Sequence, residues 1–169
     1  WAQMYHDLQN CDWRAPPSAV IDAVLESHQG PSPDTKLAAQ RDHIKRLFAA
    51  DDFRQLWKGV AADSSAFAEK LQATLATKSP TSLRVSFAQL QKGAACQNIE
   101  QVLTMEYRLS QHSMAGSDFS EGVRALLVDK DKSPKWSPAH VRDVGDDLVE
   151  RFFSPIGGRD LTWPDTRLG

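Results

Sequence analysis

Hydrophobic residues recur along this chain with the 3.6-residue period of an amphipathic helix, and the period-two alternation of a strand is almost absent. The clearest stripe runs from Phe53 through Leu56 and Trp57 to Val60, at positions i, i+3, i+4 and i+7. The same period predicts further helices at about 18–28, 35–48, 64–75, 80–92, 97–114, 118–127 and 143–153. The sequence therefore predicts a mostly α-helical fold of about eight short helices.

Residues suited to begin or end a helix stand at most of these boundaries. Ser79 before Pro80 is a strong start signal, because proline at the first helical position loses no hydrogen bond. The tetrapeptide from Asp118 to Glu121 matches a capping box, and Gly116 is expected to end the longest helix. Further N-caps are expected at Ser18, Asp51 and Ser64, and the proline-rich segment 30–34 is expected to break the chain.

The periodicity also predicts which side chains are buried. On the longest helix and the one after it, the expected apolar positions are Ile99, Val102, Leu103, Tyr107, Met114, Phe119, Val123, Leu126 and Leu127.

Composition excludes several functional classes. Hydrophobic residues make up 41% of the 169 residues, enough to bury a core, and the net charge of −2 argues against autonomous nucleic-acid binding. No apolar run approaches the ~18 residues of a membrane span. Cys11 and Cys96 form no paired motif, so we interpret both as reduced thiols of an intracellular compartment.

The residue patterns of a self-sufficient catalytic site are absent from the sequence. The histidines are not spaced with each other or with cysteine as metal ligands, so no metal site is expected. The chain has no nucleophile elbow, no P-loop and no glycine-rich strand–turn–helix segment that could donate paired amides to an oxyanion. We therefore assign no catalytic residue.

Glu106 is the first candidate for a specific role, because it lies on the expected inner face of helix 97–114. A buried carboxylate is costly unless it is paired. We interpret Glu106 as half of a structural ion pair, with Arg124 on the following helix better placed than Arg108 to be its partner. A catalytic carboxylate and simple solvent exposure are the alternatives.

A second candidate is the cluster of Lys130, Lys132 and Lys135, which ends at Trp136. Flexible ammonium groups beside an aromatic ring suit a ligand that carries phosphates and a flat ring. The alternative is a solvated turn in which Trp136 packs back onto the core. Asp129 and Asp131 alternate with the lysines and partly cancel their field, which favours that alternative.

Four segments in order resemble the C-terminal half of the 3-hydroxyisobutyryl-CoA hydrolases, within the enoyl-CoA hydratase/isomerase (crotonase) superfamily. They are SPTSLRV from residue 79, LTMEYRLS from 103, DFSEGVRALLVDKD from 118 and SPKW from 133. The resemblance implies the C-terminal helical part of a crotonase-like fold, lacking the N-terminal β/α spiral core. It divides the chain into an extension (1–15), a helical region (16–155) and an irregular tail (156–169).

The resemblance places the catalytic carboxylates and the oxyanion loop in the N-terminal half, and no position here matches them. It raises the expectation that Lys130, Lys132 and Lys135 contact the phosphates of coenzyme A. Within it, Glu121, Arg124 and Trp136 are expected to be structural. No bound cofactor is expected, with acyl-CoA as the substrate of the complete enzyme.

The sequence leaves three functional hypotheses. The first is the structural half of an acyl-CoA thioesterase that needs a separate N-terminal half. The second is a non-catalytic subunit of a mitochondrial assembly such as the ribosomal small subunit, and the third is a fragment without separate biology. The chain begins with Trp1, as a mature mitochondrial matrix protein or a fragment would. A cytoplasmic location is the alternative.

Overall fold

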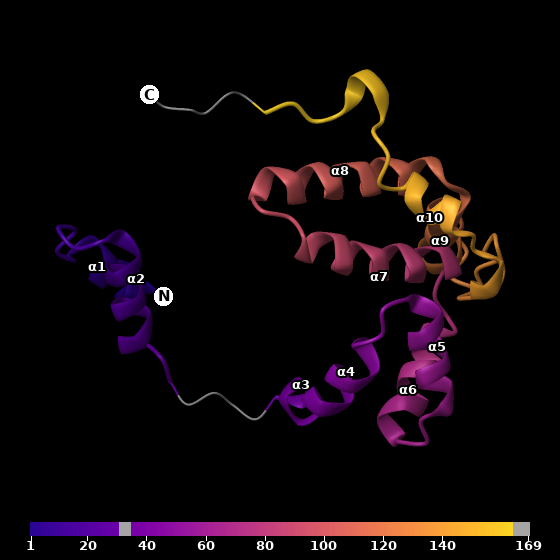
Figure 1. The fold of residues 1–169 in the computed structure, drawn as a ribbon, viewed down its shortest axis with the longest axis horizontal. Helices are drawn as coiled ribbons and strands as arrows, with labels where there is room; N and C mark the ends of the chain where they lie inside the picture. The colour runs from indigo at the N-terminus through magenta and orange to yellow at the C-terminus, as the bar shows by residue number, and fades with distance from the viewer. Residues whose placement is uncertain (31–34, 164–169) are drawn as a thin grey trace. The chain divides into compact units, whose positions relative to one another are not determined.

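A computed structural model describes residues 1–30 and 35–163, and within these ranges the regular elements are all helices (Figure 1). The prediction of a mostly α-helical fold is confirmed. The chain divides into two units, Trp1–Lys45 and Arg46–Gly169. The break expected at 30–34 lies, apart from Gly30, outside the described residues.

The first unit contains α1 (Ala2–Gln9), α2 (Pro17–Ser27), the short α3 (Lys36–Ala39) and the start of α4 (Arg41–Phe48). α1 packs against α2, whose Val20 and Val24 are buried. His28 Nε2 lies 2.7 Å from the Asp7 carboxylate and ties the end of α2 to α1. The sequence pattern does not predict α1, because its eight residues present no buried apolar side chain.

The second unit begins with a core around α5 (Phe53–Ala62) and α6 (Ala66–Leu75). Phe53, Leu56 and Val60 are buried here, as their helical spacing predicts. Their neighbours in this core include Leu47, Ala68 and Phe87. The strongest stripe in the sequence therefore forms the first core of the second unit.

A second core lies where α7 (Pro80–Ala94), α8 (Ile99–Ala115) and α10 (Asp146–Arg151) meet. α7 and α8 lie side by side (Figure 1). Val85, Leu109, Val144 and Val149 are buried between these elements.

Polar bonds fix this core. Arg108 forms a forked ion pair with Asp160, joining α8 to the segment around η3 (Gly157–Arg159). Arg84 donates to the Val144 carbonyl and to Asp146, joining α7 to the start of α10.

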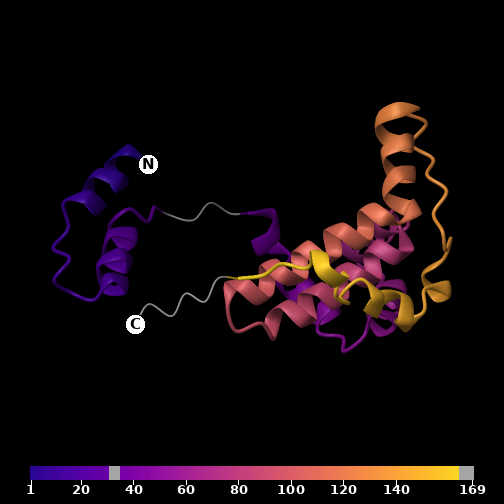
Figure 2. The same ribbon diagram turned by 90° about the horizontal axis from the view of Figure 1, so that it is seen from above.

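α9 (Ser117–Val123) continues directly into a five-residue π-helical segment, η1 (Arg124–Val128). Figure 2 shows this element projecting from the α7–α8 pair, with the following irregular chain returning alongside it. The return segment leads to η2 (Val141–Asp143). Among the described residues, no element covers the side of α9–η1 that carries Phe119, Leu126 and Leu127, so these side chains are exposed.

Several predicted helix starts differ from those in the structure. The cap at Ser79 is confirmed, whereas Asp52 and Ser65, each one residue later than predicted, cap α5 and α6. α2 begins after Pro16 rather than at Ser18. The capping box is wrong, because the Asp118 and Glu121 side chains accept hydrogen bonds from outside α9 and none caps it.

The predicted burial of α8 and α9–η1 is also partly wrong. The buried side chain of α8 is Leu109, which is not among the apolar positions expected for this helix. Ile99, Leu103, Met114, Phe119, Leu126 and Leu127 are all exposed in this chain. Periodicity identifies an apolar face, and burial requires a neighbour that the described residues do not place there.

Candidate functional site

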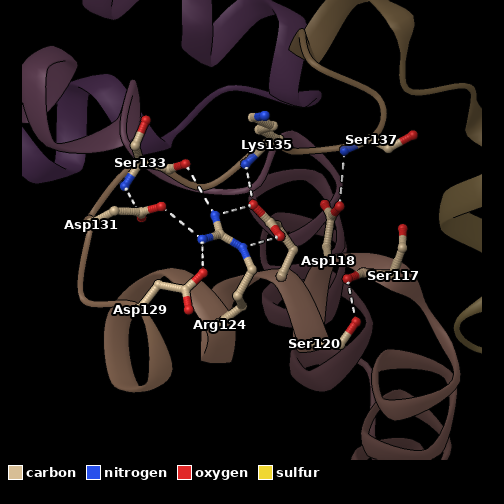
Figure 3. Close-up of polar contacts among 10 residues, drawn as sticks. Ser117, Asp118, Ser120, Arg124, Asp129, Asp131, Ser133, Lys135 and Ser137 are labelled. Carbon is tan, nitrogen blue, oxygen red and sulfur yellow. Dashed lines mark hydrogen bonds and ion pairs between the residues drawn. The ribbon is translucent and has the colours of Figure 1, made fainter.

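A single arginine joins the end of α9 to the segment that follows it. The Arg124 guanidinium donates to both Glu121 oxygens at 2.8 and 2.9 Å. It also donates to Asp129 at 2.6 Å and Asp131 at 2.7 Å, and lies 3.4 Å from the Ser133 carbonyl oxygen (Figure 3). We call Arg124, Glu121, Asp129 and Asp131 the Arg124 cluster.

The electrostatics of the cluster follow from these contacts. Hydrogen bonds from Arg124, and next the one from the Lys135 amide, lower the pKa of the Glu121 carboxyl to about 2. Arg124 also holds the pKa of Asp131 below its usual value. The same carboxylates raise the pKa of Arg124 itself. Glu121 and Asp131 are therefore charged at neutral pH, and together with Asp129 they contact one guanidinium.

The three predicted ligand-binding lysines are carried by residues 129–135, which we call the lysine segment. Lys130 and Lys132 have φ values of 58° and 54°, in the left-handed region that residues other than glycine seldom adopt. All three lysine side chains are exposed. Among the residues that the structure describes, the segment thus combines an unusual backbone with outward-facing ammonium groups.

Trp136 anchors the end of the lysine segment. Its indole N–H donates to the Thr77 carbonyl oxygen at 3.3 Å. A Cβ added at Gly122 would lie 3.3 Å from Cη2 of the ring, so the indole packs directly on the backbone of α9. Asp118 completes the anchor, accepting from the Ser137 amide at 2.9 Å and from the Ser79 hydroxyl. This contact favours an anchoring role for Trp136 over stacking on a ligand.

An apolar groove of about 1020 Å³ runs beside this anchor, between the ends of α7 and α8 and the α9–η1 element. Its apolar lining includes Phe119, Val123, Leu127, Trp136 and Phe152. Phe119 is 54% exposed and Leu127 68% exposed. The groove is therefore an apolar surface open to solvent in this chain.

The predicted pairing of Glu106 is wrong. Glu106 is exposed, and its carboxylate accepts a hydrogen bond from Gln89 Nε2 at 2.6 Å, which links α8 to α7. Arg124 is engaged by the Arg124 cluster and Arg108 by Asp160. The structural roles expected of Arg124 and Glu121 remain predictions, and their pairing with each other and with Asp129 and Asp131 was not among the expectations. The D-K-D-K alternation a few residues after Arg124 was the available signal.

The described residues were compared with the requirements of a metal-ion site and of a membrane-spanning helix. Residues 1–30 and 35–163 contain no group of three His, Cys, Asp or Glu side chains placed to hold a metal ion. In the same ranges, every helix is too short or too polar to cross a bilayer. Cys11 and Cys96 are unpaired thiols.

Several known proteins are similar in sequence to this chain over most of its length. The mitochondrial 3-hydroxyisobutyryl-CoA hydrolase of Xenopus laevis is 41% identical over 153 residues, covering 88% of this chain and 40% of the relative. The protein of the same name from Danio rerio is 42% identical over 155 residues, covering 89% and 40%. This chain therefore spans about 40% of the length of the curated relatives it matches.

Solved structures show the same fold. A carnitinyl-CoA dehydratase from Mycobacterium thermoresistibile matches with a TM-score of 0.72 and 31% identity, covering 95% of this chain and 44% of that one. An enoyl-CoA hydratase from Rhodobacter sphaeroides also gives 0.72, with 27% identity and coverages of 87% and 44%. The predicted helical part of a crotonase-like fold is confirmed.

A family model described as enoyl-CoA hydratase/isomerase matches residues 1–153. The match includes residues 1–15, and the domain boundaries drawn from the sequence at 15 and 155 remain predictions. The match covers well over half of the chain, and the solved relatives share its fold. The chain belongs to the enoyl-CoA hydratase/isomerase family.

Proposed function

We propose that this chain is the helical, non-catalytic part of an acyl-CoA thioesterase of the 3-hydroxyisobutyryl-CoA hydrolase type. Relatives of that name from Xenopus laevis and Danio rerio support the substrate class. The observation that carries the proposal is the exposed apolar groove beside α9–η1. Catalysis would require a β/α spiral half that packs against this surface.

The size and chemistry of the groove support such a partner. Exposed apolar patches of this kind mark protein interfaces, because contact with water costs free energy. The match covers 40% of the Xenopus laevis relative. The remaining 60% of that protein would supply the surface that packs on the groove. We therefore commit to the β/α spiral half as the occupant of the groove.

The lysine segment is the proposed contact to the phosphates of coenzyme A. Four cations, Arg124 and the three lysines, face three carboxylates in and around the Arg124 cluster, which leaves a formal charge of +1. Arg124 offsets only one of the three carboxylates, so the Arg124 cluster itself carries a formal charge of −2 and the three lysines outweigh it by one. The three phosphate groups of a coenzyme A thioester would be attracted to the lysine segment.

The names of the relatives also support a mitochondrial location, with the matrix as our specific proposal and the cytoplasm as the alternative. No contact among the described residues favours a role in the ribosomal small subunit. We therefore propose the hydrolase function for this chain.

Co-expression tests this proposal. The 169-residue chain is co-expressed with the β/α spiral half of a 3-hydroxyisobutyryl-CoA hydrolase, and release of the coenzyme A thiol from 3-hydroxyisobutyryl-CoA is measured. We expect the two chains to co-purify and hydrolyse the thioester, and the 169-residue chain alone to show no turnover. Loss of even one oxyanion donor costs about 10²–10³ in rate, and this sequence offers no such loop. Turnover by the chain alone, or failure of the halves to associate, would contradict the proposal.

A further inference from the structure

We propose that Arg124 is a positioning residue that locks the lysine segment into one conformation and so fixes where Lys130 and Lys132 present their ammonium groups. The locking of the segment stands on the geometry of this chain. Only its consequence for coenzyme A rests on the proposed function.

The lysine segment has little apolar surface to hold it in place. Its seven residues are DKDKSPK, in which Pro134 is the only apolar side chain, and none of the seven is buried. Hydrophobic burial, the usual source of order in an irregular segment, is therefore almost absent here. The conformation must come from polar contacts.

The backbone of the segment also resists its observed path. Two left-handed lysines within three residues are conformationally unfavourable, because the Cβ of each lies too close to its own carbonyl group. Such conformations persist only where surrounding contacts over-determine them. The Asp129 amide donates to the Arg124 carbonyl at 2.8 Å, and the Lys132 amide donates to the Ala125 carbonyl at 3.0 Å. These two bonds attach only the first half of the segment to η1.

Arg124 supplies contacts along the whole segment. One guanidinium reaches Asp129 at the start, Asp131 in the middle and the Ser133 carbonyl further along (Figure 3). Its partner Glu121 accepts the Lys135 amide at 2.7 Å, which ties down the end. The planar fork of arginine suits several acceptors at once, whereas a single ammonium group does not. Removing the Arg124 side chain would therefore loosen the segment between its start and Ser133, leaving the two backbone bonds to η1 and the bond from the Lys135 amide to Glu121.

A lysine-specific protease measures this order directly in the full 169-residue chain. Cleavage after Lys130, Lys132 and Lys135 is followed by mass spectrometry and compared with cleavage after Lys58 and Lys70 on α5 and α6. Arg124→Gln removes no lysine, so the cleavage sites stay the same. We expect Arg124→Gln to speed cleavage within the lysine segment by about tenfold, while the reference sites change less than about twofold.

The matched control is Arg108→Gln, which removes another forked arginine pair, that with Asp160, away from the lysine segment. It should leave cleavage after Lys130 and Lys132 unchanged. Two results overturn the inference: no acceleration in Arg124→Gln, or equal acceleration at all lysines, which would mean global unfolding.

A milder variant keeps the test decisive if Arg124→Gln does not fold. Asp131→Asn weakens one contact to Arg124 and leaves the pair with Glu121 intact. It should accelerate cleavage after Lys130 and Lys132 selectively, by about threefold. Unchanged cleavage in Asp131→Asn would then overturn the inference.

Coenzyme A binding to the co-expressed complex separates this inference from the proposed function. If the lysines bind its phosphates, Arg124→Gln and Lys132→Gln should both weaken coenzyme A affinity and raise KM by about fivefold with little change in kcat. Selective proteolysis with unchanged affinity in both variants would support the role of Arg124 and overturn the assignment of the lysines to coenzyme A.

Discussion

At the scale of single residues, Arg124 and Glu121 are the most strongly coupled pair in this region, and their coupling has a direct pH signature. Because the pKa of Glu121 is lowered to about 2 in the folded chain, its ion pair stabilises the fold above the unfolded value near 4.5. That stabilisation is lost as the pH falls towards 2.

We therefore expect the melting temperature of the unmodified chain to exceed that of Arg124→Gln at pH 6, and this difference to shrink as the pH is lowered towards 2. Circular dichroism melts of both proteins across this range measure it. A difference that stays constant down to pH 2 would show that Glu121 and its neighbouring carboxylates do not depend on Arg124.

Leu56 and Leu127 differ in burial although both lie at apolar helical positions. Leu56 is 1% exposed in the core between α5 and α6, whereas Leu127 faces solvent. Leu56→Ala should lower the free energy of unfolding by about 2–5 kcal/mol, because it leaves a cavity. Leu127→Ala should change it by less than about 0.5 kcal/mol in the chain alone. Denaturant titration measures both, and equal effects would contradict the assignment of the core.

At the scale of elements, the start of α7 couples two helices through one hydroxyl. Ser79 accepts from the Ser82 amide as an N-cap and donates to Asp118 on α9. Ser65 caps α6 through the Ala68 amide and serves as the matched control. Ser65→Ala should cost about 1 kcal/mol of unfolding free energy, and Ser79→Ala should cost more because it also removes the hydrogen bond to Asp118.

Chemical denaturation of the two variants and of Asp118→Asn tests this coupling. The double variant Ser79→Ala/Asp118→Asn should cost less than the sum of the two single variants, because they remove the same bond. Additive effects would show that the bond between α7 and α9 contributes nothing to stability.

At the scale of the whole molecule, the open groove predicts how the chain behaves without its partner. Exposed Phe119, Leu126 and Leu127 form an apolar surface that favours association between copies. We expect the isolated chain to be heterogeneous in size, and Leu127→Glu to shift it towards monomer.

Leu90→Glu is the control for this prediction. Leu90 is as exposed as Leu127 but lies on α7 outside the groove, so its replacement should change association less. Light scattering coupled to size exclusion measures the mass of each variant. A monodisperse monomer of the unmodified chain would show that the groove needs no partner.

Features that depend on neighbours along the chain follow from the amino-acid sequence alone. The helical class, the core stripe of α5 and the N-cap at Ser79 all follow from spacings of a few residues, and the structure confirms them. The ordered motifs were also sufficient to recognise the family.

Which distant groups meet depends instead on how the helices pack. Glu106 stands on an apolar face by its spacing, yet it is exposed and bonded to Gln89 because α7, not α9, runs alongside it. Arg124 turns to the segment that folds back beside α9 and pairs with Asp129 and Asp131. Helical periodicity specifies the direction of a side chain relative to its own axis. The partner of that side chain depends on how the axes pack, and that is set by contacts summed over the whole unit.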